Sequence, residues 1–176
     1  ILLIILVFYL LLGCLMDSLS MILLTIPIFW PIVQELDFNL VSMVDLQAAR
    51  LDGMIAGGKE IPAVLLSEAQ AMLANGQELS REMTREIKLR GVSEGALNRV
   101  NIERTAIWFG ILVLIVVEVG LITPPVGMNL FVINAMDRKT SMVDTYIAVL
   151  YFVCSDLVRV ILLVVFPIIT LILLPI

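Results

Sequence analysis

Two consecutive prolines interrupt the apolar second half of this chain. Pro124 and Pro125 lie between an apolar block at 106–119 and a shorter apolar block at 128–136. A proline has no backbone N–H and its ring clashes with the preceding turn, so a pair of prolines breaks a regular helix. A glycine on each side of the pair frees the backbone further. The pattern predicts a helix, a break and a second helix.

The two apolar blocks are short for a membrane crossing. The first would form a helix of roughly 21 Å at 1.5 Å per residue, whereas a full crossing takes about 20 residues. Irregular backbone at membrane depth is tolerated only where it is buried in protein or lines a watery cavity. Residues 105–136 are therefore predicted to form a re-entrant hairpin whose tip carries the break; a kink in a spanning helix is the alternative. Interrupted helices of this kind hold substrate and coupling ions in secondary transporters.

The composition places the chain in a membrane. Of its 176 residues, 61% are hydrophobic, and the mean hydropathy is +1.09, whereas soluble domains are about 45–50% apolar. The expected fold class is therefore all-α integral membrane. Histidine is absent, and the sequence contains no zinc-ligand spacing and no glycine-rich phosphate loop. We expect neither an enzyme nor a bound cofactor, and we expect Cys14 and Cys154 to be free thiols.

The first segment, 1–38, is apolar with one internal charge. We expect a spanning helix over about 2–25, a break or kink near Pro27 and a short helical turn to about residue 35. Asp17 lies inside the expected span. An ionisable group within a span is costly and is a functional candidate by default. The alternative is a carboxylate that a neighbouring serine satisfies.

Residues 39–104 form a polar and charged segment. The region from Glu35 to Arg104 holds 19 of the 27 charged residues, so we place this segment outside the bilayer. Turn signals divide it into helical patterns at 43–55, 63–74 and 80–89, the last with Ser80 as its N-cap. A small helical subdomain, a mostly disordered loop and an inserted foreign segment all remain open.

The last segment, 137–176, starts with a polar turn and continues as an apolar run from Asp144 to about Leu174. We expect a C-terminal transmembrane helix there. Asp156 and Arg159 lie three residues apart on one helical face, where opposite charges pair. Because pairing is the usual way in which a membrane tolerates charges, a structural contact facing the bundle is favoured over a role in gating.

The predicted break carries the groups that a sodium ion needs. A helix that ends near Gly120 leaves its last carbonyl oxygens unpaired at the negative end of its dipole. Carbonyl and hydroxyl oxygens are the ligands that hard cations prefer. The predicted sodium ligands are Gly120, Thr123, Pro124 and Val126.

The other side of the break suits an anion. The second helix begins near its flanking glycine, so its free N–H groups favour negative charge. The residues predicted to face a substrate are Gly127, Met128 and Asn129. Two further ionisable candidates are Asp17 and Glu118, which lies in the last turn of the first helix. For Glu118, a proton or cation site and a neutral packing residue remain equally open.

The break also carries a family resemblance. Gly120-Leu-Ile-Thr-Pro-Pro-Val-Gly127, followed by Asn129-Leu-Phe, closely resembles the C-terminal hairpin of the large membrane subunit of TRAP transporters, the DctM-like family. Two flanking stretches are similar to the same family: Gly13-Cys-Leu-Met-Asp17, which two prolines follow, and Asp156-Leu-Val-Arg159. The resemblance covers the chain outside 39–104.

The resemblance implies half of an inverted-repeat transporter fold, and it implies that the chain lacks a first repeat. The implied function is a segment of a sodium-coupled, binding-protein-dependent secondary transporter that imports organic acids of the C4-dicarboxylate or sialic-acid type. The implied partners are a small TRAP membrane subunit, a periplasmic solute-binding protein and the lipid bilayer. The implied location is the bacterial inner membrane, crossed more than once, and no nucleic-acid partner is implied.

Three other functions remain open: an ion-coupled anion transporter of related fold, a membrane interaction protein and an inactive truncated product. Sidedness is open as well. Basic residues flank both ends of the predicted hairpin, which the positive-inside rule assigns to the cytoplasm. The family resemblance implies instead a hairpin that opens to the outside.

Overall fold

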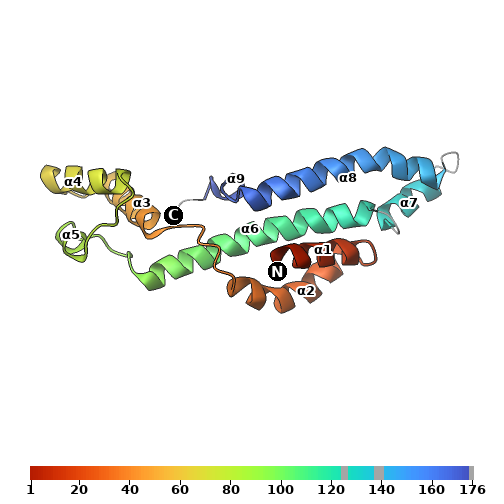
Figure 1. Cartoon of the computed structure of the whole chain (residues 1–176), viewed down its shortest axis with the longest axis horizontal. Coiled ribbons are helices and arrows are strands. Elements are labelled where there is room, and N and C mark those ends of the chain that lie inside the picture. Colours follow the sequence, from red (N-terminus) through yellow and green to blue (C-terminus); the bar gives the residue numbers. More distant parts are fainter. Residues whose placement is uncertain (124–126, 137–140, 175–176) are drawn as a thin grey trace. The chain divides into compact units, whose positions relative to one another are not determined.

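The computed structural model describes residues 1–123, 127–136 and 141–174 (Figure 1). Every regular element in these ranges is a helix, which confirms the all-α fold class. The chain divides into two compact units. Unit 1 comprises Ile1–Asp37 and Ala106–Leu171, and unit 2 comprises Phe38–Thr105 with the residues from Ile172 onward.

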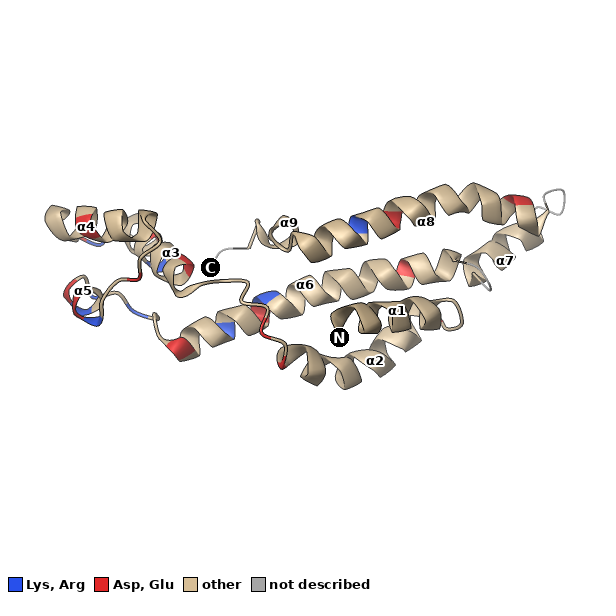
Figure 2. Cartoon of the chain, in the orientation of Figure 1, with Lys and Arg blue, Asp and Glu red and all other residues tan. Residues whose placement is uncertain are grey.

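Unit 1 contains the apolar helices. They are α1 (Leu2–Gly13), α2 (Ser18–Gln34), the greater part of α6 (Glu94–Ile122), α7 (Met128–Met136), α8 (Met142–Val165) and α9 (Ile168–Leu171). Among the described helices, α6 and α8 are the two that are long and apolar enough to cross a membrane. Figure 2 shows how sparsely the apolar helices of this unit are charged.

The N-terminal helix breaks after Gly13 rather than near Pro27. The chain turns at 14–16, and Asp17 then caps α2, because its carboxylate accepts the Ser20 N–H at 3.1 Å and the Ser20 hydroxyl at 3.2 Å. The expected continuous spanning helix is therefore wrong. The Asp17 carboxylate is exposed and bonds to a neighbouring serine. This is the alternative to a functional role that the sequence left open.

Helix α2 continues through Pro27 and Pro31. Each proline removes one donor from the helical hydrogen-bond ladder, and helices in apolar surroundings tolerate such a loss where neighbouring groups compensate. The buried Thr25 hydroxyl donates to the Met21 carbonyl at 2.7 Å, a contact of the kind that bends helices. The prolines therefore lie within α2 and do not end it.

Helix α6 begins at Glu94, well before the expected start of the apolar arm at 106. Ser93 caps it by accepting the Ala96 N–H at 3.2 Å, and Glu94 places a negative charge in the first turn, where the helix dipole favours it. The charged turns and the apolar block thus form one helix of 29 residues. This helix is long enough to cross a membrane, whereas the apolar arm alone was expected to be too short.

Helix α7 does not fold back on α6. Figure 1 shows α7 leading away from the far end of α6 and α8 returning alongside α6. The indole N–H of Trp108 on α6 donates to the Leu163 carbonyl on α8 at 2.8 Å, which joins these two helices. The structure does not confirm the expected hairpin of two arms at 105–136. It does show a pair of contacting neighbours in unit 1, the helices α1 and α2.

Aromatic side chains hold this pair of helices on α6. The ring of Tyr9 on α1 is fully buried. Its centroid lies 5.5 Å from that of Phe29 on α2 and 6.5 Å from that of Phe109 on α6. Such tilted and edge-to-face pairs contribute about 0.5–1.5 kcal/mol beyond their buried area.

Unit 2 is built from α3 (Met43–Ala56), α4 (Ala63–Ala74), α5 (Arg81–Glu86) and the first turns of α6. Ser42 and Asp45 form a reciprocal capping box at the start of α3. Ser80 caps α5 by accepting the Met83 N–H at 3.2 Å, as the sequence predicted. The charged segment is therefore a small helical unit rather than a structureless loop.

A buried amide organises unit 2. The side-chain oxygen of Gln47 on α3 accepts the Leu79 N–H at 2.7 Å, and its nitrogen donates to the Leu79 carbonyl at 3.4 Å. One side chain thereby pairs both backbone groups of a buried residue. The core cluster around this contact comprises Leu51, Ala69, Leu79, Ile87 and Leu89.

The predicted ion pair in α8 is present, and Arg159 contacts the Asp156 carboxylate at 2.5 Å. The side chain of Arg159 is 57% exposed, so the pair lies on the surface of unit 1 and does not face a packed bundle. Both cysteines are free thiols, as expected, with Cys14 buried and Cys154 exposed.

We predict that Gln47→Leu loosens unit 2. Leucine has a similar volume but leaves the buried N–H and carbonyl of Leu79 unpaired, at a cost of about 1–3 kcal/mol for each group. Hydrogen exchange on the full chain in detergent should become faster across 43–89. The matched control, Gln70→Leu at an exposed position of α4, should exchange like the native chain. Equal protection in Gln47→Leu would contradict the role given to this amide.

Candidate functional site

Helices α1 and α6 touch through two glycines. A Cβ placed on Gly120 would lie 2.7 Å from the Cα of Gly13, and a Cβ placed on Gly13 would lie 3.0 Å from the Cα of Gly120. No side chain fits so close to a backbone carbon in a close-packed interior. Gly13 ends α1, and Gly120 lies in the last turn of α6. The contact therefore brings the two helix breaks of unit 1 together.

Two helix C-termini meet at this contact. The carbonyl oxygen of Leu10 lies 3.0 Å from the Cβ position of Gly120, and that of Val117 lies 3.1 Å from the Cβ position of Gly13. The C-terminal end of a helix carries roughly half a negative charge. Helices α1 and α6 thus place two negative ends side by side, and the Asp17 carboxylate follows shortly after the first. This arrangement favours a cation.

Thr123 directly follows α6 and folds back onto its last turn. Its hydroxyl donates to the Val119 carbonyl at 2.5 Å, and its N–H donates to the Gly120 carbonyl at 3.1 Å. The hydroxyl hydrogen is committed to Val119, whereas the oxygen keeps its lone pairs for another partner. The geometry is compatible with the sodium ligand predicted at this position.

Gly127 starts the second helix in a conformation that favours glycine. Its φ is +53°, and its carbonyl accepts the Leu130 N–H at 2.8 Å. The Cβ position of Gly127 lies 3.4 Å from the carbonyl oxygen of Thr123, so the end of α6 and the start of α7 are in contact. Two other predicted sodium ligands, Pro124 and Val126, lie outside the described residues.

The predicted substrate-facing residues Met128 and Asn129 form the exposed first turn of α7. Their backbone N–H groups belong to the positive end of that helix. Glu118 is exposed on α6, within two turns of its C-terminal end. Asp17 follows Gly13 by four residues and caps α2. Among the described residues, the structure brings Gly120 next to Gly13 and Gly127 next to Thr123.

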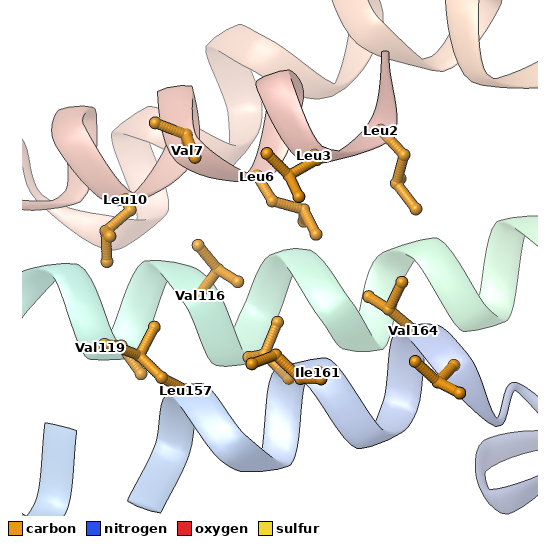
Figure 3. Close-up of a pocket in the computed structure, with 12 residues that line it drawn as sticks. Leu2, Leu3, Leu6, Val7, Leu10, Val116, Val119, Leu157, Ile161 and Val164 are labelled. Atoms are coloured by element: carbon orange, nitrogen blue, oxygen red, sulfur yellow. The ribbon is translucent and has the colours of Figure 1, made fainter. Parts of the chain in front are cut away.

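A cavity of about 340 Å³ lies between α1, α6 and α8 (Figure 3). Apolar side chains from the three helices line it completely: Leu2, Leu3, Leu6, Val7, Leu10, Val116, Val119, Leu157, Val160, Ile161, Val164 and Val165. A charged ligand needs polar partners when it leaves water. This cavity therefore does not suit an ion or a carboxylate.

No group of three Asp, Glu or Cys side chains that could hold a metal ion is present within the described ranges. A cation at the breaks would rely instead on carbonyl oxygens and the Thr123 hydroxyl. Such neutral oxygen ligands suit a weakly held monovalent ion that must leave again.

The role of Gly13 as a contact point was not predicted from the sequence. Asp17 followed by Ser20 is an N-cap signal, and it could have located the first break. The approach of Gly13 to Gly120 is a tertiary contact between residues far apart in sequence. No local pattern predicts this contact. The one sequence feature that points toward it is a glycine shortly before each break.

Comparison with known proteins identifies a family. The family profile described as "Tripartite ATP-independent periplasmic transporter, DctM component" matches residues 1–169, a range that runs across the charged segment. No curated protein and no solved structure matches the chain.

We predict that Gly120→Ala separates the two breaks. The new methyl group would lie 2.7 Å from a backbone carbon that cannot rotate away, and overpacking of this kind costs about 1–3 kcal/mol. Thermal unfolding of the full chain in detergent should therefore shift to lower temperature.

Gly110→Ala is the matched control on the same helix, because nothing lies within 4 Å of its Cβ position. Alanine favours a helix over glycine by about 1 kcal/mol, so this variant should be neutral or slightly more stable. The glycine contact is refuted if Gly120→Ala unfolds at the same temperature as Gly110→Ala.

Proposed function

The chain belongs to the family of DctM components of tripartite ATP-independent periplasmic transporters, and we propose that its two adjacent helix breaks form a sodium-coupled transport site. Members of this family are membrane components of secondary transporters rather than enzymes. The observation that carries the proposal is the contact between Gly13 and Gly120, because it brings the C-terminal ends of α1 and α6 together.

Electrostatics supports a cation at this point. Two negative helix ends side by side repel each other in a medium of low dielectric constant, and a monovalent cation between them relieves the repulsion. The Asp17 carboxylate adds negative charge next to the first end and is itself exposed. We assign the Thr123 hydroxyl and carbonyl oxygens near Gly120 as the sodium ligands, with Pro124 and Val126 as further carbonyl donors.

The start of α7 supplies the complementary charge. The N–H groups of Met128 and Asn129 lie at the positive end of this helix. The Cβ position of Gly127, the residue before them, lies 3.4 Å from the Thr123 carbonyl oxygen. A carboxylate there would lie beside the bound cation, so that each ion strengthens the binding of the other. The substrate that this pairing favours is an organic acid, of the dicarboxylate or sialic-acid type.

The arrangement of unit 1 supports a revised topology. We propose that α6 and α7 form one interrupted crossing, that α8 forms the return crossing, and that α1 and α2 form a re-entrant hairpin. Helices α1 and α2 have 12 and 17 residues, fewer than the about 20 that a crossing needs. The chain would then work in the bacterial inner membrane as half of an inverted-repeat fold, with a small membrane subunit and a periplasmic solute-binding protein as partners.

The first prediction of this proposal concerns sodium. In the assembled transporter, Thr123→Val keeps the shape of the side chain and removes the hydroxyl oxygen. The sodium concentration for half-maximal uptake should rise about tenfold, which corresponds to about 1.4 kcal/mol. Thr123→Ser keeps the oxygen and should stay close to native. An unchanged sodium dependence in Thr123→Val would assign Thr123 to packing.

The second prediction concerns topology. In a chain with both native cysteines replaced by alanine, single cysteines at the exposed positions Glu103 and Met136 should react with impermeant maleimide from opposite faces of the membrane. Single cysteines at Leu3, near the start of α1, and at Glu35, just after α2, should react from the same face. Labelling of the first pair from one face would restore the hairpin at 105–136 and refute the interrupted crossing.

A further inference from the structure

Unit 2 carries a group of basic side chains that the transport site does not use. Between residues 38 and 105 the chain has eight Lys and Arg and nine Asp and Glu, so the unit is nearly neutral as a whole. Its charges are nevertheless segregated. Four of the eight basic residues line one surface depression of about 420 Å³: Arg50, Lys59, Lys88 and Arg90.

No acidic residue lines this depression. Its remaining lining residues are Ala49, Gly53 and Met54. Among the residues that the structure describes, the Asp156–Arg159 contact of unit 1 is the one ion pair within 4.0 Å. The four basic side chains therefore face a shared space without a carboxylate partner.

Contacts between α3, the turn after it and the turn after α5 bring two of these basic side chains close to the backbone after α5. The Lys59 ammonium donates to the Lys88 carbonyl at 3.4 Å. The guanidinium Nε of Arg50 lies 3.6 Å from the Cβ position of Gly91, the residue that follows Arg90. The depression is thus formed by α3, the turn after it and the turn after α5, which are far apart in sequence.

Lys88 occupies a position that normally favours glycine. Its φ is +54°, and the N–H groups of Lys88 and Leu89 close the end of α5 by donating to the Arg85 and Thr84 carbonyls at 3.1 and 2.8 Å. This is the Schellman arrangement, in which the left-handed residue is usually glycine. A lysine adopts this left-handed conformation less readily than a glycine does, but it adds a positive charge at the rim of the depression.

A second basic depression adjoins the first. It shares Lys88 and Arg90 with it, adds Arg85 and again contains no acidic residue. The favourable interaction of Arg85 and Lys88 with the C-terminal end of α5 accounts for these two cations. It does not account for Arg50 and Arg90, which lie on other segments.

We propose that this basic depression binds a phosphate group. A phosphate carries up to two negative charges on tetrahedral oxygens, which matches cations that approach from several sides, whereas a single carboxylate is planar and singly charged. Arginine pairs with phosphate through two parallel N–H donors, and lysine adds a compact charge. A lipid headgroup and a free phosphate compound both present this chemistry. The site lies in unit 2, and the proposal stands apart from the transport function of unit 1.

Calorimetric titration of the full chain with inorganic phosphate tests the proposal, with the chain held in nanodiscs of phosphatidylcholine. Arg50→Gln and Arg90→Gln should each weaken phosphate binding at least tenfold. Arg81→Gln removes the same charge from the same unit, but Arg81 lines neither depression. This control should change the affinity less than twofold. All three side chains are exposed, so the variants keep the fold.

Nanodiscs that also contain phosphatidylglycerol distinguish the two sources. If a lipid headgroup occupies the site, these nanodiscs should abolish the binding of inorganic phosphate; if the natural ligand is a free phosphate compound, the binding should stay the same. The proposal is overturned if phosphate does not bind in phosphatidylcholine nanodiscs. It is also overturned if Arg81→Gln weakens binding as much as Arg50→Gln, or if succinate binds as tightly as phosphate.

Discussion

The close contact between Gly13 and Gly120 is the constraint on which the rest of unit 1 depends. With the backbones this close, the C-terminal ends of α1 and α6 lie together and their negative poles add. Asp17 follows the end of α1 by four residues, and Thr123 directly follows the end of α6. Without the glycine contact, the chain would have two separate helix breaks.

The composition and the break at Pro124-Pro125 were sufficient to predict an all-helical membrane protein and its family. Local signals also predicted the cap at Ser80 and the Asp156–Arg159 pair. These features depend on residues within one or two turns of each other, where spacing determines contact. The N-cap at Asp17 also depends on nearby residues, but the apolar pattern around it pointed to a continuous helix.

The arrangement of the helices could not be predicted in the same way. A break was predicted near Pro27, yet α2 continues through this proline. The effect of a proline in a helix depends on which groups surround the carbonyl that it leaves unpaired. The direction of α7 after α6 depends on packing against α8, which no residue near the break encodes. For this reason the sequence predicted a hairpin at 105–136 that the structure does not confirm, and it did not predict that the ends of α1 and α6 lie together.

The central claim is that these two breaks form a single ion site, and Cys14 offers a direct test. This buried thiol lies at the α1–α2 break, whereas Thr123 lies at the α6–α7 break. The rate at which a permeant maleimide alkylates Cys14 should be compared in sodium and in potassium, with the exposed Cys154 as the internal control. We predict that sodium slows the reaction of Cys14 alone, and that Thr123→Val removes this protection. Equal rates for Cys14 in sodium and potassium would contradict the account.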